Sequence, residues 1–437
     1  MISTEIMATW RGSVTNYLPG KLGQNTIWAL SGYGVRLVIQ AVYFVIIARS
    51  LGVNQYGGFV AATALSAVIS PFVGIGAGNL LVKNVARDQS LFSRYWGNGL
   101  LMTLASGVLF VAIVCTLGFE VLPRSTPLLV VALISASDLI FVKLLDMAAW
   151  AFQAFEMLAQ NAQLNVLVSF TRLAGIAALA GVVSHPTVKM WSVVYLTGSV
   201  ISGLIGVIWA TAKLGAPRLA LGKIRAEIVE GFHFSVSLSA QTIYNDIDKT
   251  MVARLSTLEA AGIYAAAYRI IDVAFTPVRA VLNAAFPAFF RHGKDGFQSG
   301  LQFGRRLLVR TLPYPLLAFV ALMAGASLLP LILGEGFRQA TEALRWLAPL
   351  PLLKTLHYFV SDALTGSGFQ GTRTLAQIGV AVFNVALNFV LIPSYGWRGA
   401  AWASIASDGL LAVALWCVAA VLLARRPRGL QTSEDLV

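Results

Sequence analysis

The chain has 437 residues, of which 57% are hydrophobic and only 12% are charged, whereas soluble domains usually carry about 25% charged residues. Its apolar residues gather into segments of about 20, the length that an α-helix needs to cross a hydrocarbon core roughly 30 Å thick. The net charge of +13 comes from short Lys and Arg clusters between these segments, without a nucleic-acid-binding motif. The composition therefore excludes a soluble domain, argues against a nucleic-acid partner, and predicts an all-α integral membrane protein in a lipid bilayer.

The predicted elements begin with a cytoplasmic segment, residues 1–26, followed by an apolar run of full spanning length. No small-residue cleavage pattern follows that run, so we expect it to stay as the first helix. Twelve transmembrane helices are predicted in all, although the pattern is also compatible with eleven or thirteen. In chain order they cover residues 27–48, 57–81, 97–119, 127–149, 162–183, 190–212, 231–253, 260–288, 307–333, 342–365, 375–392 and 399–424.

The connections between these helices differ in charge on the two sides of the membrane. Most Lys and Arg residues fall in alternate connections, and the opposite connections hold single cations. Because short basic loops stay on the cytoplasmic side, this alternation predicts an even helix count with both termini in the cytoplasm. The protein is therefore expected to be a multi-pass membrane protein.

The longest polar connection divides the predicted helices into six and six. We expect an N-lobe at 27–212, a cytoplasmic linker at 213–230, a C-lobe at 231–424 and a cytoplasmic tail at 425–437. A weak repeat agrees with two lobes, because residues 48–57 resemble residues 253–262, although chance similarity of Ala/Gly-rich segments explains it as well. Two such halves around a central cavity are common in transporters.

Arginines inside the predicted spans are candidates for binding an anion. A charge within lipid costs about 2.5 to 3.5 kcal/mol on insertion scales, and a guanidinium matches phosphate oxygens in bidentate geometry. Arg36, Arg172, Arg269 and Arg279 are the candidates for a lipid diphosphate. Arg269 and Arg279 have the alternative of pairing with Asp272 on one helix face, whereas partners for Arg36 and Arg172 must come from another helix or from substrate.

Carboxylates within the spans are candidates for ion coupling. Asp248 lies in the sequence Asn245-Asp-Ile-Asp-Lys249, in which Asp246 and Lys249 are spaced to pair. Asp138 and Asp408 lie near the middle of their spans without an adjacent cation in the sequence. Each of these residues has a second interpretation as a buried tether between helices.

Enzyme chemistry finds little support in the sequence. The four histidines form no metal-ligand spacing, and neither a Walker A motif nor a dinucleotide fingerprint occurs. The glycines of Gly74-Ile-Gly-Ala-Gly78 indicate close helix approach instead. Cys115 and Cys417 lie in apolar spans as packing residues. We therefore expect a protein that is not an enzyme and that needs no cofactor or metal.

Three stretches resemble the Wzx-like polysaccharide-biosynthesis flippases of the multidrug/oligosaccharidyl-lipid/polysaccharide exporter (MOP) superfamily. They are Phe44 to Phe59 with Leu80 to Asp88, Tyr244 to Arg254 with Ala261 to Ile270 and Phe286-Pro287, and Asn384 to Ala401. The resemblance implies two six-helix lobes and the transfer of undecaprenyl-diphosphate-linked oligosaccharides, for O-antigen, capsule or exopolysaccharide synthesis, by alternating access. It matches Asp248 and Arg269 to family positions, whereas Arg36 and Arg172 depend on the physical argument alone. A polysaccharide polymerase and its chain-length machinery are the further partners that it implies.

Several alternatives stay open at this stage. A drug or cation exporter of the same superfamily would favour an acidic cavity, and a peptidoglycan-precursor flippase usually has two more helices than the twelve predicted. A membrane-embedded polymerase would need a large catalytic loop, and the predicted loops are short. A scaffold without transport activity is compatible with the sequence.

Overall fold

The computed structural model describes residues 21–424, without the side chains of residues 21–33, 233, 234, 236–241 and 243–245. The predicted cytoplasmic tail and most of the predicted N-terminal segment lie outside the described residues. Every regular element within the described range is helical, as the composition predicted.

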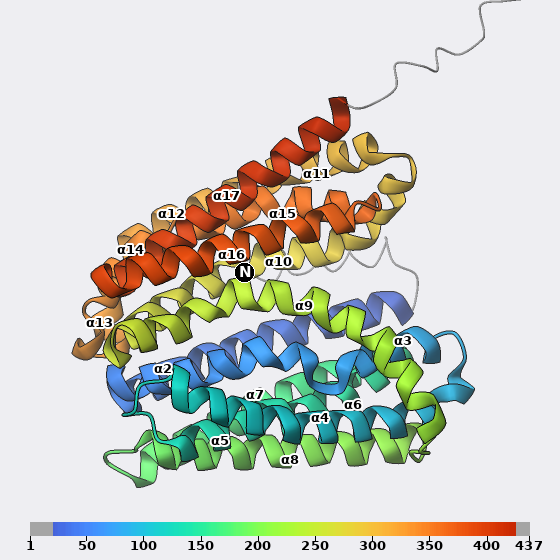
Figure 1. Ribbon diagram of the computed structural model, residues 1–437, viewed down its shortest axis with the longest axis horizontal. Coiled ribbons are helices and arrows are strands. Elements are labelled where there is room, and N and C mark those ends of the chain that lie inside the picture. The colour runs from blue at the N-terminus through green and yellow to red at the C-terminus, as the bar shows by residue number, and fades with distance from the viewer. Residues whose placement is uncertain (1–20, 425–437) are drawn as a thin grey trace, which may run out of the picture. The chain divides into compact units, whose positions relative to one another are not determined.

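The chain divides into two compact units, the first ending at Arg254 and the second beginning at Leu255. The first unit contains helices α2 to α9, which run roughly along a common direction in Figure 1. Its elements are α2 (Lys21–Ile69), η1 (Ser70–Gly76), α3 (Ala77–Val85), η2 (Gln89–Leu91), α4 (Phe92–Val121), α5 (Leu128–Ala136), η3 (Ser137–Phe141), α6 (Val142–Ala154), α7 (Leu158–Val182), α8 (Val188–Leu214) and α9 (Leu221–Leu255).

The second unit is also a helical bundle. Its elements are α10 (Leu258–Lys294), α11 (Phe297–Thr311), α12 (Pro313–Gly325), η4 (Ala326–Leu328), α13 (Leu329–Leu333), η5 (Glu335–Phe337), α14 (Ala340–Leu347), α15 (Leu350–Gly366), α16 (Gln370–Tyr395) and α17 (Trp397–Ala424). Helix α15 packs against both α10 and α17, and α16 packs against α17. The division at Arg254 groups α9 with the first unit, and the predicted lobe boundaries and linker stay predictions.

Each predicted span overlaps a helix of the structure. Nine helical segments in the described part of the chain are long and apolar enough to cross a membrane, so the count of twelve spans stays a prediction. The first two predicted spans are joined within α2, which passes through Gly52 at φ 68° and ψ 170°. These values lie outside the helical region, so the chain kinks between the two spans without an intervening loop.

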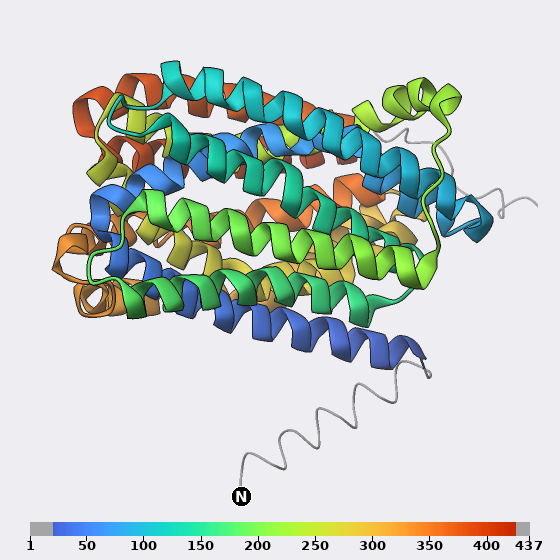
Figure 2. The ribbon, with the colours of Figure 1, turned by 90° about the horizontal axis from the view of Figure 1, so that it is seen from below.

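Small residues allow the helices of the first unit to approach closely. A Cβ atom at Gly78 would overlap the ring of Trp150, and one at Gly76 would overlap the backbone of Gly231 in α9. Helices α7 and α8 likewise run side by side (Figure 2), and a Cβ at Gly175 of α7 would meet Val194 of α8. The glycine-rich sequence therefore marks close helix approach, as predicted.

Candidate functional site

A short π-helical turn carries the first group of candidate residues. The turn, η3, comprises Ser137 to Phe141 and joins α5 to α6 within one predicted span. Glycines of the neighbouring helices allow it to pack, because a Cβ at Gly203 would lie 2.7 Å from the Phe141 carbonyl oxygen. π-Helical turns occur mainly as single turns within α-helices and often at functional sites.

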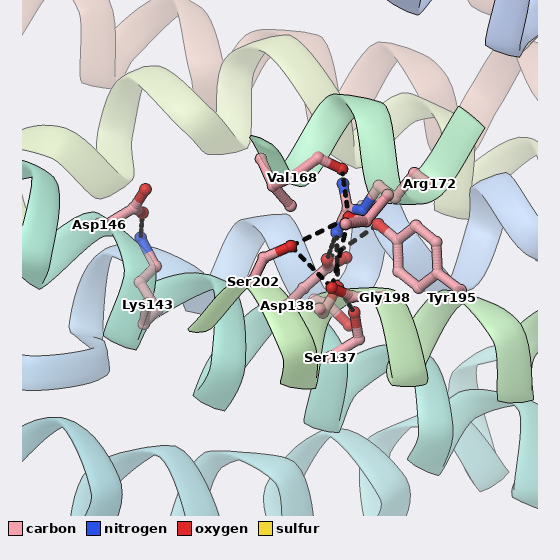
Figure 3. Close-up of polar contacts among 12 residues, drawn as sticks. Ser137, Asp138, Lys143, Asp146, Val168, Arg172, Tyr195, Gly198 and Ser202 are labelled. Carbon is pink, nitrogen blue, oxygen red and sulfur yellow. Dashed lines mark hydrogen bonds and ion pairs between the residues drawn. The ribbon is translucent and has the colours of Figure 1, made fainter. Parts of the chain in front are cut away.

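Asp138 on this turn is the centre of a polar cluster (Figure 3). The Nη2 atom of Arg172 on α7 lies 2.8 Å from its Oδ1 atom, and the Tyr195 hydroxyl on α8 donates to the same oxygen at 2.9 Å. The Arg172 guanidinium carbon also lies 4.0 Å from the centre of the Tyr195 ring. Three helical segments therefore hold one carboxylate and one guanidinium together.

This geometry joins two residues that the sequence treated separately. Arg172 was expected to find its partner on another helix or in substrate, and the structure provides Asp138. Asp138 has no adjacent cation in its own span, yet it pairs with Arg172 through space. Both side chains are 21% exposed, so the pair is accessible to water at a small part of its surface.

Further charges extend the cluster along the first unit. Lys143 and Asp146 on α6 form an ion pair at 3.6 Å, visible apart from the Arg172 cluster in Figure 3. Arg36 on α2 donates to the Asn165 Oδ1 atom at 3.0 Å, and it interacts electrostatically with Asp146, as do Lys143 and Arg172. Three cations thus lie close enough to Asp146 to interact with it.

Asp408 is the corresponding buried carboxylate of the second unit. Its Oδ1 atom lies 3.0 Å from Nε2 of His357 on α15, and the two side chains are 2% and 3% exposed. On the same helix, the Lys354 ammonium donates to the Tyr268 hydroxyl at 2.8 Å. This pairing could not be predicted from the sequence, because the histidines have no metal-ligand spacing and contacts between α15 and α17 leave no signal within a single helix.

The remaining candidates lie on α9 and α10. Asp248 is 2% exposed and accepts a hydrogen bond from the backbone nitrogen of Lys249 at 2.7 Å. The predicted Asp246 to Lys249 pairing is confirmed, with the ammonium and carboxylate 2.7 Å apart. On α10, Arg269 is half-buried, and no ion pair between Arg269 and Asp272 is present in the structure.

Arg279 is the partner that Asp272 takes instead. The Nη2 atom of Arg279 lies 3.9 Å from the Asp272 Oδ1 atom, and the two side chains are 52% and 35% exposed. Its guanidinium carbon lies 5.5 Å from the centre of the Phe275 ring. An exposed and loosely held guanidinium of this kind is available to an anion.

Comparison with known sequences identifies a family. The sequence matches the family described as polysaccharide biosynthesis protein over residues 22–292, which is more than half of the chain. No curated protein matches the chain at a significant level.

Several solved structures share the fold. A multidrug resistance MATE family transporter of the MOP superfamily, in an inward-facing conformation, has a TM-score of 0.73 at 14% identity and covers 91% of this chain and 100% of its own. The lipid II flippase MurJ has a TM-score of 0.70 at 13% identity and covers 90% and 87%. A MOP superfamily transporter from Pyrococcus furiosus has a TM-score of 0.64 at 14% identity and covers 92% and 95%. The chain therefore has the MOP transporter fold and is a multi-pass membrane protein.

Proposed function

The chain belongs to the polysaccharide biosynthesis protein family, and on that premise we propose that it is a flippase for undecaprenyl-diphosphate-linked oligosaccharide repeat units. It moves them across the bacterial inner membrane by alternating access, for O-antigen, capsule or exopolysaccharide synthesis. Both termini lie in the cytoplasm, and a polysaccharide polymerase with its chain-length machinery receives the product.

The observation that carries this proposal is the concentration of cations among half-buried groups of the first unit. Arg36, Lys143 and Arg172 all interact with Asp146, and Arg172 also pairs with Asp138. Charge within a membrane is costly, so we infer that these cations are retained because they serve an anionic ligand. A diphosphate is a suitable ligand because guanidinium groups bind its oxygens in bidentate geometry. An exporter of cationic drugs would require the opposite sign.

The ion pair of Arg172 with Asp138 gives the proposal a mechanism. A diphosphate that approaches Arg172 competes with the Asp138 carboxylate for the same Nη2 donor. Occupation of Asp138 by the coupling ion frees the guanidinium for the phosphate oxygens, and departure of that ion restores the pair and releases the lipid. In the second unit, Asp408 with His357, and in α9 Asp248, are further carboxylates for ion coupling. Arg269 and Arg279 on α10 provide additional cations for the diphosphate.

The sugar part of the substrate explains why a protein is needed. Moving hydroxyl groups through hydrocarbon without hydrogen-bond partners costs several kcal/mol each. A polar path through the protein removes that cost, while the polyprenyl chain stays in the lipid.

The experiment is transport of a fluorescent undecaprenyl-diphosphate-linked oligosaccharide in proteoliposomes, measured as loss of accessibility to an externally added quencher. We expect the intact protein to transport the lipid and a proton gradient to accelerate transport. Arg36→Gln and Arg172→Gln should each lower the rate by about tenfold or more, the usual effect of losing a charged hydrogen bond. Arg124→Gln, in an exposed loop, is the matched control.

The outcomes separate the competing functions. Absence of transport with every lipid-linked sugar, combined with uptake of a cationic dye, would establish an exporter instead. Transport that survives in the Arg36 and Arg172 variants would return both arginines to structural roles. An Asp138→Asn variant whose rate no longer responds to the proton gradient would support the exchange mechanism.

A further inference from the structure

A cavity of about 280 Å³ lies inside the first unit, separate from the ion pair of Arg172 with Asp138. Its walls come from the end of α2, the η1 turn, α3, α4, α6 and α9. The side chains used below are Ser70, Asn79, Thr103, Lys143, Trp150 and Ser235. A single water needs only about 10 to 15 Å³ of such space, so the cavity has room for a group the size of a sugar ring.

Two buried hydroxyl groups on this wall lack hydrogen-bond partners. The Oγ1 atom of Thr103 and the Oγ atom of Ser235 are inaccessible to water and unbonded among the described residues. The two residues are 1% and 0% exposed and come from α4 and α9. A buried hydroxyl without a partner costs about 1 to 3 kcal/mol, and few such groups occur in native structures. Both residues line the cavity, and rotation about χ1 would turn each hydroxyl toward a ligand that supplies the missing bond.

The same cavity has a strained backbone wall. Gly74, Ile75 and Gly76 have φ values of 72°, 47° and 72°. A β-branched residue at positive φ is an outlier, and such strain tends to cluster at binding and switch sites. The absence of a side chain at Gly74 also leaves room for Thr103, because a Cβ at Gly74 would lie 2.9 Å from the Thr103 Oγ1 atom. This wall therefore packs closely against the Thr103 hydroxyl.

Lys143 gives the cavity its charge and Trp150 gives it an aromatic surface. Lys143 is the only charged residue among the described residues of the lining. Its ammonium lies 3.6 Å from the Asp146 carboxylate, with which it also hydrogen-bonds. Because an ammonium has three donors, the bond to Asp146 leaves others for a ligand. Asp146 is shared with Arg36 and Arg172. Hydroxyl and amide groups beside one cation and one indole ring match a polar ring with an attached anionic group.

From these features we infer that the cavity is a saccharide site that receives a single pyranose ring bearing a carboxylate. Thr103, Ser235 and Asn79 bond the ring hydroxyls, Trp150 contacts the apolar face of the ring, and Lys143 binds the carboxylate. The inference rests on the proposed function and names one substrate class for it, a repeat unit that contains an acidic sugar. A neutral sugar would fill the same space but would have no carboxylate for Lys143 to bind.

The test is direct binding of three probes to the full-length protein in lipid nanodiscs, measured by ligand-detected saturation-transfer NMR. The probes are D-glucuronate, D-glucose and acetate, which represent the ring with its charge, the ring alone and the charge alone. We expect glucuronate to bind most tightly. Lys143→Gln should weaken glucuronate by about tenfold or more and leave glucose within about twofold. Lys189→Gln, an exposed lysine at the start of α8, is the control.

Thr103→Val separates a binding role from a structural one. Because the Thr103 hydroxyl has no protein partner, its loss should leave the melting temperature unchanged or raise it, while glucuronate and glucose binding both weaken by about threefold or more. Ser235→Ala should behave in the same way. A Thr103→Val variant with a lowered melting temperature and unchanged binding would show that the hydroxyl is structural and would overturn the inference.

The remaining outcomes are also decisive. Absence of saturable glucuronate binding to the intact protein, or equal binding of glucuronate and acetate, overturns the saccharide site. If glucuronate and glucose bind equally and Lys143→Gln affects neither, the inference that the site prefers an acidic sugar is overturned. Binding is measured independently of transport. Saccharide binding without any lipid flipping would refute the proposed flippase function but would support the saccharide site. Lipid flipping without saccharide binding would support the flippase function and refute the saccharide site.

Discussion

Replacing Asp138 with asparagine should lower the free energy of unfolding by about 2 kcal/mol. Asparagine keeps an acceptor for the Tyr195 hydroxyl but removes the charge that holds Arg172 at 2.8 Å. Losing a charged hydrogen bond costs about 1.5 to 3 kcal/mol, and removing one partner of a fully buried pair costs about 3 to 5 kcal/mol. Because both side chains are 21% exposed, water compensates part of the loss, and we expect the lower range.

A double-mutant cycle isolates the pair itself. Asp138→Asn, Arg172→Gln and the double variant would be unfolded reversibly in mixed micelles of constant lipid content and followed by tryptophan fluorescence. We expect the double variant to be more stable than the sum of the single effects predicts, by about 1.5 kcal/mol, because the second substitution removes the unpaired charge left by the first. Asp138→Asn combined with Arg124→Gln is the additive control.

Additivity would refute this reasoning. Independent sites add within about 0.5 kcal/mol, so a coupling energy below that value would mean that Arg172 and Asp138 do not depend on each other in the membrane. The pair would then carry neither the stability nor the exchange mechanism proposed for it.

Three further predictions concern packing, the second unit and the surface. Gly231→Ala should destabilise the protein by about 1 to 3 kcal/mol because its Cβ meets backbone atoms, whereas Gly34→Ala, with open space around it, should be neutral or slightly stabilising; thermal unfolding in detergent compares them. Asp408→Leu should cost about 1 to 3 kcal/mol more than Asp408→Asn, because only asparagine keeps an acceptor for the buried His357, and equal melting temperatures would contradict this. Lys83→Gln should change stability by less than about 1 kcal/mol because its ion pair is exposed; a larger loss at low salt would show that the pair is stronger than its exposure indicates.

The sequence predicted the helical class and the positions of the spans because both depend on local hydrophobicity. It also predicted that Arg172 needs a partner from outside its own helix. It did not identify Asp138 as that partner, because helical periodicity relates only residues of one helix and the π turn shifts the phase between α5 and α6. The pairing of His357 with Asp408 could not be predicted for the same reason, because α16 lies between α15 and α17 in the chain.

The backbone of the cavity wall was equally hard to predict. The glycines at 74, 76 and 78 indicated close packing, and the structure confirms it. Nothing in the sequence predicted that Ile75 between them takes a positive φ, because local preferences disfavour that conformation for a β-branched residue. Tertiary packing determines it, so it becomes visible only in the structure.

The π turn at Ser137 to Phe141 makes this segment sensitive to changes in length rather than in side-chain identity. A π turn closes its hydrogen bonds to the fifth residue instead of the fourth, so it holds one residue more than the α-helical turn that it replaces. Deleting one residue from the turn would therefore leave a continuous α-helix, with Lys143 and Asp146 close to their present face of α6. What would be lost is the widened turn itself, from which Asp138 meets Arg172.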